Sequence, residues 1–493
     1  MVFNSFLFLC FFPIVVVIHF ILPHKFRVYL LLVASYLFYM CWNPSYIFLI
    51  LLSTVITYFG GGLIESFLEK EKLKYAKTIL GLCIGSNLFV LFFYKYLNFG
   101  IDVITKLFRL LGMELSIPGH DLLLPVGISF YTFQALSYII DVYQKKINAE
   151  RNFFYYALFV SFFPQLVAGP IERSKHLLSE LHNVKNFNFE KLKEGFLLML
   201  WGYFLKLVIA DRASIFVDKV YSNYEEFGGW FLIIATLLFA VQIYCDFCGY
   251  SIIAKGAALI LGVDIMENFN SPYLSVSVSD FWRNWHISLT TWFRDYLYIP
   301  LGGNRKGKVH KYINKMIVFL LSGLWHGANT TFIIWGGING LYQVIEDETY
   351  SLRQKISNIL KIERDSIGHR MFQVIATNIL ISISWVFFRS QNVSQAFAIL
   401  KSMMQADNFH ILLDGSAYNC GLNSKNFWLL IISIIVLLVA DMYKKRGVLI
   451  RKTIMSQNYI YRAIFYTISI AFILLFGVWG PAYDATGFIY FRF

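Results

Sequence analysis

The sequence has little charge for its length. Only 15% of its 493 residues are Asp, Glu, Lys or Arg, whereas 57% are hydrophobic. Soluble globular domains carry about 25% charged residues, so this composition excludes an ordinary soluble protein. The short alternating segments of a transmembrane β-barrel are also missing. Apolar residues instead come in blocks of about 17 to 25, each long enough to cross a hydrocarbon core of about 30 Å as a helix. We therefore expect an all-α, polytopic membrane protein, because backbone groups in lipid must bond to one another.

Cysteine is scarce as well. The six cysteines lie mostly inside apolar blocks and do not suggest a disulfide framework. Cys245 and Cys248 form a CxxC pair, but neither a second pair nor suitably spaced histidines accompany it, so we expect no metal site. Residues 1–27 lack a basic start and a small-residue cleavage pattern, which indicates a retained first span. The net charge of +13 falls in short loops beside the spans, where membrane topology explains it, so we expect no nucleic-acid partner.

About 11 to 12 helices are predicted to span the membrane. The candidate spans are 2–22, 27–42, 46–64, 78–96, 122–143, 195–211, 228–262, 312–326, 330–345, 371–388, 426–443 and 458–480. The loops that hold most of the lysine and arginine are assigned to the cytoplasm; they are 24–27, 69–77, 145–151, 305–315 and 444–452. With the N-terminus outside, the alternation of the spans places all five loops in the cytoplasm if segment 152–170 dips into the membrane and returns without crossing. Pro164, Gly169 and Pro170 favour such a broken segment.

Two further segments are too polar to span. The stretch 264–311 is rich in aromatic residues, which is typical of helices that lie along the cytoplasmic interface. The loop 389–425 is expected outside, with a short surface helix over 394–404. Neither an internal repeat nor a long polar linker interrupts the chain, so we predict a single domain over 1–493.

A lone histidine, His326, stands inside the apolar stretch "SGLWHGANTTFIIWGG" at 322–337. Ten helical residues separate it from Met316, which places its ring about 15 Å above the interface. The neighbouring glycines, Gly323, Gly327, Gly336 and Gly337, allow close helix packing or leave room for a substrate chain. A histidine at this depth either bonds to a neighbouring helix or marks a functional site, and the residue alone leaves both interpretations open.

Two more polar positions are candidates. His286 lies in the aromatic stretch "FWRNWHISLTTWFRDYLYIPLGG"; the alternative is an interfacial histidine in an aromatic belt. Asp246 lies late in an apolar run, where a carboxylate needs a partner, and we expect a histidine or an arginine to be that partner. The pair could be a structural salt bridge or part of catalysis, and the sequence leaves both open. Asp211 and Arg212 are predicted to form an ordinary charged helix end.

Five ordered blocks resemble the signature blocks of the membrane-bound O-acyltransferase (MBOAT) family. They are "PVGISFYTFQALSYIIDVY", "FFPQLVAGPIERS", "QIYCDFCGYSIIAKGAALILG", "SDFWRNWHISLTTWFRDYLYIPLGGNR" and "GLWHGANTTFIIWGGINGLY". The similarity covers essentially the whole chain and is greatest to the bacterial branch of alginate and polysaccharide O-acetylation. It implies a ring of helices around a central funnel in the bacterial cytoplasmic membrane. It also implies a thioester donor, acetyl-CoA or a carrier-protein phosphopantetheine, with no tightly bound cofactor. The expected partner is a separate extracytoplasmic SGNH-type acetyltransferase.

The resemblance matches His326 and His286 to the two family histidines. We expect His326 to act as general base or transient acyl acceptor, with His286 orienting it or stabilising developing charge. Other residues are expected to support the site or line the substrate channel: Asp246, Arg283, Trp325, Asn329, Arg294 and Asp295. Arg305, Lys306 and Lys308 are expected to attract the donor's phosphates, although membrane topology alone explains these charges.

Three alternatives remain open from the sequence. One is transfer of D-alanine from a carrier protein to teichoic acid. Another is a proton-coupled transporter with a relay of His326, Asp246 and Asp295, although the inverted repeats common in transporters are not seen. The last is an inactive scaffold for an extracytoplasmic enzyme.

Overall fold

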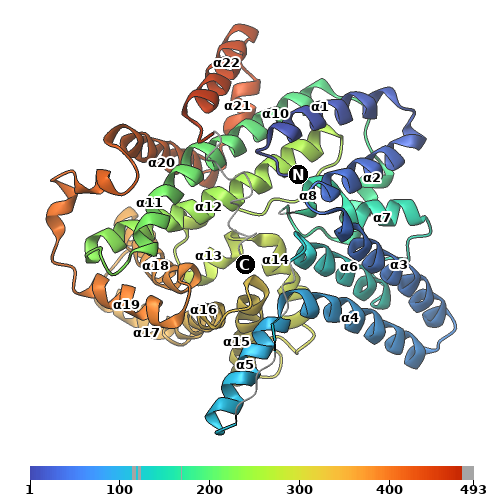
Figure 1. Cartoon of the computed structure of the whole chain (residues 1–493), viewed down its shortest axis with the longest axis horizontal. Coiled ribbons are helices and arrows are strands. Elements are labelled where there is room, and N and C mark those ends of the chain that lie inside the picture. The colour runs from blue at the N-terminus through green and yellow to red at the C-terminus, as the bar shows by residue number, and fades with distance from the viewer. Residues whose placement is uncertain (114–117, 120–123, 168, 480–493) are drawn as a thin grey trace. The chain divides into compact units, whose positions relative to one another are not determined.

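The structure, a computed structural model, describes residues 1–113, 118–119, 124–167 and 169–479. Throughout these residues the regular secondary structure is helical and no strand occurs, which confirms the all-α class (Figure 1). Internal contacts divide the chain into two compact units. Unit 1 comprises Met1–Phe196 and Ala254–Met266, and unit 2 comprises Leu197–Ile253 and Glu267–Phe493. A single domain over 1–493 stays a prediction.

Unit 1 contains the N-terminal helices. They are α1 (Phe6–Ile21), α2 (His24–Met40), η1 (Pro44–Tyr46), α3 (Ile47–Glu69), α4 (Leu73–Lys95), α5 (Leu97–Leu110), α6 (Ile128–Tyr143), α7 (Phe153–Ser161), α8 (Phe163–Leu166) and α9 (Ser174–His182). Two further helices have residues in both units; they are α10 (Phe189–Tyr203) and α12 (Gly229–Ile260).

Unit 2 contains the remaining elements, of which η2 and η4 are π-helices. They are η2 (Phe204–Ala210), α11 (Asp211–Ser222), η3 (Pro272–Leu274), α13 (Val278–Asn284), α14 (Ile287–Phe293), η4 (Arg294–Tyr298), α15 (Lys308–His326), α16 (Thr330–Glu348), α17 (Tyr350–Ile359), α18 (Ile367–Arg389), α19 (Val393–Met404), η5 (Phe409–Leu412), η6 (Ser416–Asn419), α20 (Ser424–Lys445), α21 (Ile450–Met455) and α22 (Tyr459–Phe476).

Six helices in the described part of the chain are long and apolar enough to cross a membrane, which confirms a polytopic membrane protein. They are Pro44–Glu69, Leu73–Lys95, Gly229–Ile260, Ile367–Arg389, Ser424–Lys445 and Tyr459–Phe476. The predicted count of 11 to 12 is larger because α1, α2 and α6 have only 16 or 17 residues, while α15 and α16 carry charged residues at one end. Predicted spans 122–143 and 458–480 each include residues outside the described part of the chain.

One predicted span has a different form in the structure. The segment 195–211 was expected to be a single helix, but α10 ends at Tyr203 and the chain continues as the π-helix η2 and then as α11 to Ser222. A π-helix widens the backbone turn, and such bulges are frequent at functional sites. The hydropathy pattern carries little signal for this change, because every residue of η2 except Lys206 is apolar.

The predicted broken segment in unit 1 is present. Helix α7 ends at Ser161, Phe162 leaves the helical conformation, and α8 begins at Phe163 with Pro164 in its first turn. The buried amide of Gln165 donates to Gln134 Oε1 of α6 at 3.1 Å. A neighbouring helix thus satisfies polar groups in the broken segment, as a non-helical chain inside a membrane requires. Its return to the cytoplasmic side stays a prediction, and residue 168 lies outside the described residues.

The two segments predicted to be too polar to span also form short helices. Within 264–311 the chain makes α13, α14 and η4, and the Ser277 side chain caps α13 by accepting from the backbone N–H of Asp280. The predicted surface helix over 394–404 corresponds to α19, which buries Gln395, Ala396 and Ile399 on one side. The amphipathic pattern therefore predicted this helix correctly.

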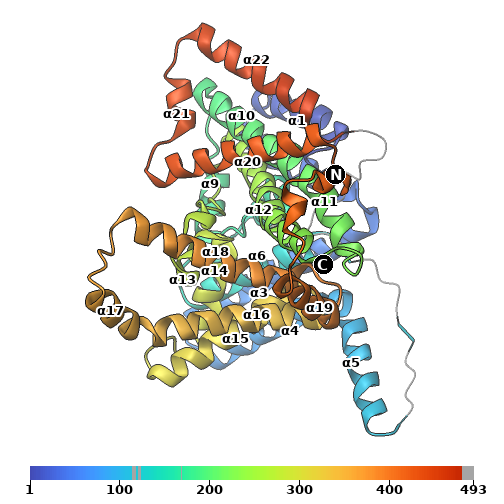
Figure 2. The same ribbon diagram turned by 90° about the vertical axis from the view of Figure 1, so that its left-hand side faces the viewer.

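Helices α15 and α16 of unit 2 lie side by side as an antiparallel pair (Figures 1 and 2). Gly323 and Gly336 face each other at the crossing. A Cβ added at Gly323 would overlap the carbonyl oxygen of Phe332, and one at Gly336 would overlap the carbonyl oxygen of Phe319. Only glycine permits this backbone contact.

Replacement of Gly336 by alanine should lower the thermal unfolding midpoint, because the new methyl group cannot fit against the Phe319 carbonyl without moving α16. Overpacking of this kind costs about 1–3 kcal/mol and outweighs the roughly 1 kcal/mol that alanine gains over glycine in helix propensity.

Gly337→Ala is the matched control, since its Cβ would meet only Leu320 Cδ2 at 3.6 Å. The purified variants can be compared in one detergent by intrinsic fluorescence. Equal midpoints for both variants would contradict the close packing of α15 on α16.

Candidate functional site

The two candidate histidines are buried neighbours in unit 2. His286 is the N-cap residue of α14, and His326 is the last residue of α15. Their side chains are only 1% and 4% exposed, and their ring centroids lie 6.5 Å apart. The structure therefore brings together two rings that are 40 positions apart in the sequence. An interfacial histidine in an aromatic belt does not describe His286, because the ring is buried inside the unit.

The backbone at His286 is strained. Its φ of 43° and ψ of 55° lie in the left-handed region, which costs a non-glycine residue about 1–2 kcal/mol. Asn268 holds the turn in place: its carbonyl oxygen accepts from the Ile287 N–H at 2.9 Å, and its side-chain Oδ1 accepts from the N–H and hydroxyl of Ser288 at 3.1 and 2.8 Å. Strain that is fixed by neighbouring bonds is typical of residues in functional sites.

Aromatic rings enclose both imidazoles. Trp325 lies beside the two, with centroid distances of 5.7 Å to His286 and 5.0 Å to His326. Phe247 packs edge-on against His286 at 4.6 Å, and Trp335 packs edge-on against His326 at 5.0 Å. Burial lowers the pKa of His286 to about 3, so this ring is neutral at physiological pH. A neutral imidazole has one donor and one acceptor nitrogen, as general base catalysis and hydrogen-bond orientation both require.

Asp246 has a partner that the sequence interpretation missed. Its Oδ1 lies 2.6 Å from Lys206 Nζ, and the same ammonium lies 2.8 Å from Asp211 Oδ1. All three side chains are buried, and Lys206 stands in the π-helix η2. The structure thus gives Asp246 a lysine partner, where the sequence interpretation considered only a histidine or an arginine. The lysine inside the apolar run "FLKLVIADR" is the signal that could have revealed it, because an intramembrane cation needs a counter-ion.

The expectation of an ordinary charged helix end at Asp211 and Arg212 is wrong. Asp211 belongs to the buried triad with Lys206. Arg212 is buried, and its guanidinium donates to the carbonyl oxygens of Val208 at 2.6 Å and Phe476 at 2.7 Å. The sequence placed these charges at the end of a span, whereas the π-helix carries the chain onward and encloses them.

Several predicted supporting residues do not join the histidines. Arg283 and Arg294 are exposed, and Arg294 pairs with the half-buried Asp295 at 2.8 Å. Of the residues in the alternative transport relay, Asp246 pairs with Lys206 and Asp295 pairs with Arg294. Asn329 caps α16 by accepting from the Thr331 N–H at 3.0 Å, and its amide donates to the Gln391 carbonyl at 2.9 Å. These contacts give Asn329 a structural role.

Arg305 and Lys306, before α15, and Lys308, its first residue, are exposed. Lys308 pairs with Glu348 at 2.6 Å, which reduces its attraction for the phosphates of a donor. Lys311 and Lys315 both pair with Asp347, at 2.7 and 2.6 Å. The role predicted for Arg305, Lys306 and Lys308 stays a prediction, and ion pairing weakens it for Lys308.

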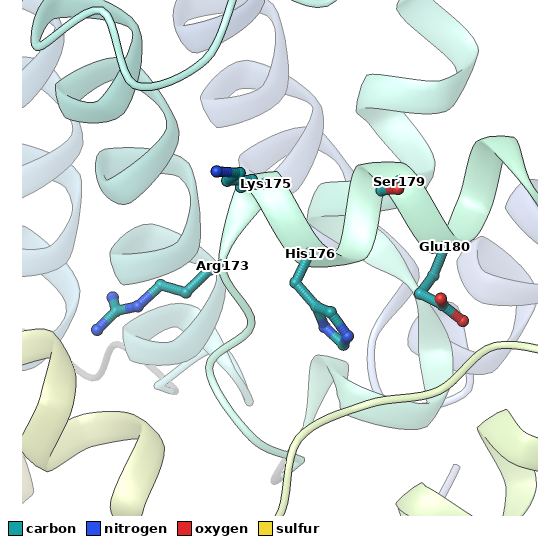
Figure 3. A pocket seen from close by; sticks show the side chains of 5 residues that line it. All are labelled: Arg173, Lys175, His176, Ser179 and Glu180. Atoms are coloured by element: carbon teal, nitrogen blue, oxygen red, sulfur yellow. The ribbon is translucent and has the colours of Figure 1, made fainter.

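A cavity of about 440 Å³ lies at the surface of unit 1, and neither His286 nor His326 lines it. It is lined by Arg173, Lys175, His176, Ser179 and Glu180 (Figure 3). His176 and Glu180 extend from the same side of α9, and Arg173 comes just before the helix. The hydrogen bond to Glu172, 2.9 Å long, raises the pKa of His176. These residues were not predicted as a site, and Glu172 and Glu180 offset much of the positive charge.

Cys245 and Cys248 are buried, free thiols in α12. Across the described ranges, we find no group of three or more His, Cys, Asp or Glu side chains placed to hold a metal ion. The site itself offers two imidazoles in an aromatic enclosure of low polarity. Such a site can remove a proton from a hydroxyl group and keep water from a reactive ester.

Comparisons with known proteins indicate the family of the chain. The sequence model of the membrane-bound O-acyltransferase family matches residues 145–389, a range that contains both histidines and the Lys206 triad. The probable alginate O-acetylase AlgI of Pseudomonas syringae pv. tomato is 38% identical over 414 residues, which are 83% of this chain and 76% of the relative. The peptidoglycan O-acetyltransferase of Helicobacter pylori is 33% identical over 76% of this chain and 73% of the relative.

A relative of lower identity is named for a different transfer reaction. The teichoic acid D-alanyltransferase of Bacillus subtilis is 27% identical over 48% of this chain and 62% of its own length. The relatives named O-acetylases and O-acetyltransferases thus match at higher identity and over more of the chain.

Replacement of Lys206 by methionine should strongly destabilise the protein, because it removes the cation that both buried carboxylates contact. Removing one partner of a buried ion pair costs about 3–5 kcal/mol. The measurement is the thermal unfolding midpoint in detergent. The variant K206M/D211N/D246N, which removes all three charges, should recover much of this loss. Native stability in K206M alone would contradict the triad.

Proposed function

Since the chain belongs to the membrane-bound O-acyltransferase family, we propose that it transfers an acetyl group from a cytoplasmic thioester donor for O-acetylation of an extracytoplasmic polysaccharide. The protein is a multi-pass membrane protein and an O-acyltransferase that acts on hydroxyl groups. Its proposed location is the bacterial cytoplasmic membrane. The proposed donor is acetyl-CoA or a phosphopantetheine thioester, and the proposed partner is an extracytoplasmic SGNH-type acetyltransferase.

One observation carries the proposal: two buried imidazoles with ring centroids 6.5 Å apart inside the range matched by the family. The identities with relatives named for O-acetylation support an acetyl group over D-alanine. Buried histidines also suit a thioester, because its carbonyl carbon is already activated and mainly needs a base and protection from water.

In the proposed reaction His326 accepts the proton of the acceptor hydroxyl while the hydroxyl oxygen attacks the thioester carbonyl carbon. The carbon–oxygen bond forms, the carbon–sulfur bond breaks, and the proton passes from His326 to the leaving thiolate. The neutral ring of His286 orients His326 or the acyl group through one N–H. Trp325, whose ring neighbours both imidazoles, helps to exclude water from the reacting atoms.

Replacement of His326 by alanine should lower acetyl transfer by about 10²–10⁴-fold, the usual contribution of a general base. The measurement is radiolabelled acetyl transfer from acetyl-CoA in membrane vesicles, together with base-labile acetate on envelope polysaccharide in cells.

His310→Ala is the matched control, because this exposed histidine lies in the same helix. Both variants must show native size-exclusion profiles. Wild-type transfer by His326→Ala would refute the proposed base, and release of alanine in place of acetate would identify the protein as a D-alanyltransferase.

A further inference from the structure

Three tryptophans of unit 2 pack on one another beside the histidines. The rings of Trp282 and Trp335 have centroids 5.4 Å apart, and those of Trp335 and Trp385 stack at 5.7 Å. Two of the three indole N–H groups have protein acceptors. Trp282 Nε1 donates to Asn339 Oδ1, and Trp385 Nε1 donates to the Tyr273 hydroxyl, each at 3.2 Å.

Trp335 differs from both neighbours. Its side chain is 1% exposed, yet its Nε1 has no hydrogen-bond acceptor within the described ranges of the chain. A buried donor without an acceptor costs about 1–3 kcal/mol, and a site enclosed by aromatic rings offers little water to replace the missing acceptor. A buried donor of this kind needs an explanation, and one explanation is that the substrate brings the acceptor.

The position of Trp335 indicates which substrate atom that acceptor is. Its ring packs edge-on against His326, with centroids 5.0 Å apart and planes at 88°, and against Phe388 at 5.2 Å. An acyl group within reach of His326 therefore also lies next to this indole. When a hydroxyl attacks the acyl carbon, negative charge develops on the carbonyl oxygen, and a fixed donor in a site of low polarity stabilises that charge.

We infer that the indole N–H of Trp335 donates a hydrogen bond to the acyl carbonyl oxygen of the donor thioester. This inference rests on the proposed function. As the hydroxyl oxygen bonds to the carbonyl carbon, the electron pair of the C=O π bond moves to the oxygen that Trp335 holds. The pair returns when the carbon–sulfur bond breaks and the thiol leaves with the proton carried by His326. Trp335 is then a catalytic residue that keeps its own proton throughout.

Trp335→Phe tests the inference in the full-length protein, using acetyl-CoA as donor in membrane vesicles. Loss of one oxyanion donor typically lowers kcat by about 10²–10³-fold, and we expect a fall of this size with little change in the KM for acetyl-CoA. The thermal unfolding midpoint should fall less than in the Trp385 variant described next, because the donor that is removed has no acceptor among the described residues.

Trp385→Phe is the matched control, since it deletes the same atom from the same cluster. Here the N–H has a protein acceptor, so the substitution leaves the Tyr273 hydroxyl without its donor and should lower the unfolding midpoint. It should not cause the hundredfold loss of kcat. The two variants are thus expected to change stability and turnover in opposite ways.

A second variant addresses packing at Trp335. Benzothienylalanine has the shape of tryptophan but carries sulfur in place of the N–H, so it should reproduce the loss of kcat seen with phenylalanine. Near-native kcat in both Trp335 variants, with an inactive His326→Ala, would overturn the role of Trp335 and leave the proposed function standing. A loss of stability equal to that of Trp385→Phe would also overturn it. An active His326→Ala would instead reject the proposed function.

Discussion

The backbone contact between α15 and α16 is the constraint on which the candidate site depends. Gly323 and Gly336 bring the two helices together, and the short connection from Gly327 to Asn329 leads from His326 directly into α16. The ring of Trp335, in the second turn of α16, therefore packs against His326 in the last turn of α15. A larger residue at either glycine would separate the helices and change the distance between these two rings.

Burial has opposite consequences for the two kinds of polar cluster in unit 2. The imidazoles of His286 and His326 are enclosed mainly by aromatic rings, and burial lowers the pKa of His286 so that its ring is neutral. The ammonium of Lys206, in contrast, is fixed between two carboxylates. Such a triad is costly to bury and holds its members in one geometry, so it suits a structural role around the π-helix better than proton transfer.

Much of the site follows from local sequence, and the errors arise where the chain departs from regular geometry. Hydropathy predicts the helices, proline and glycine predict the break between α7 and α8, and an intramembrane histidine marks His326 as a candidate. The π-helix η2 has no sequence signature, so Lys206 and the burial of Arg212 were missed. Arg283 and Arg294 share a motif with His286 but point to the surface, because residues close in a motif face different sides of short helices.

The sequence by itself determined the all-α membrane class and the family, and it singled out His286 and His326 as candidates, since these depend on composition, the length of apolar runs and the order of motifs. Only the tertiary structure decided that His286 and His326 are neighbours and that Lys206 pairs with Asp246. It also decided that the ring of Trp335 packs against His326, while its indole N–H has no acceptor among the described residues. The physical reason is that each of these facts is a distance between side chains from different helices. Such distances depend on how closely and at what angle helices pack, and one-dimensional periodicity does not contain that information.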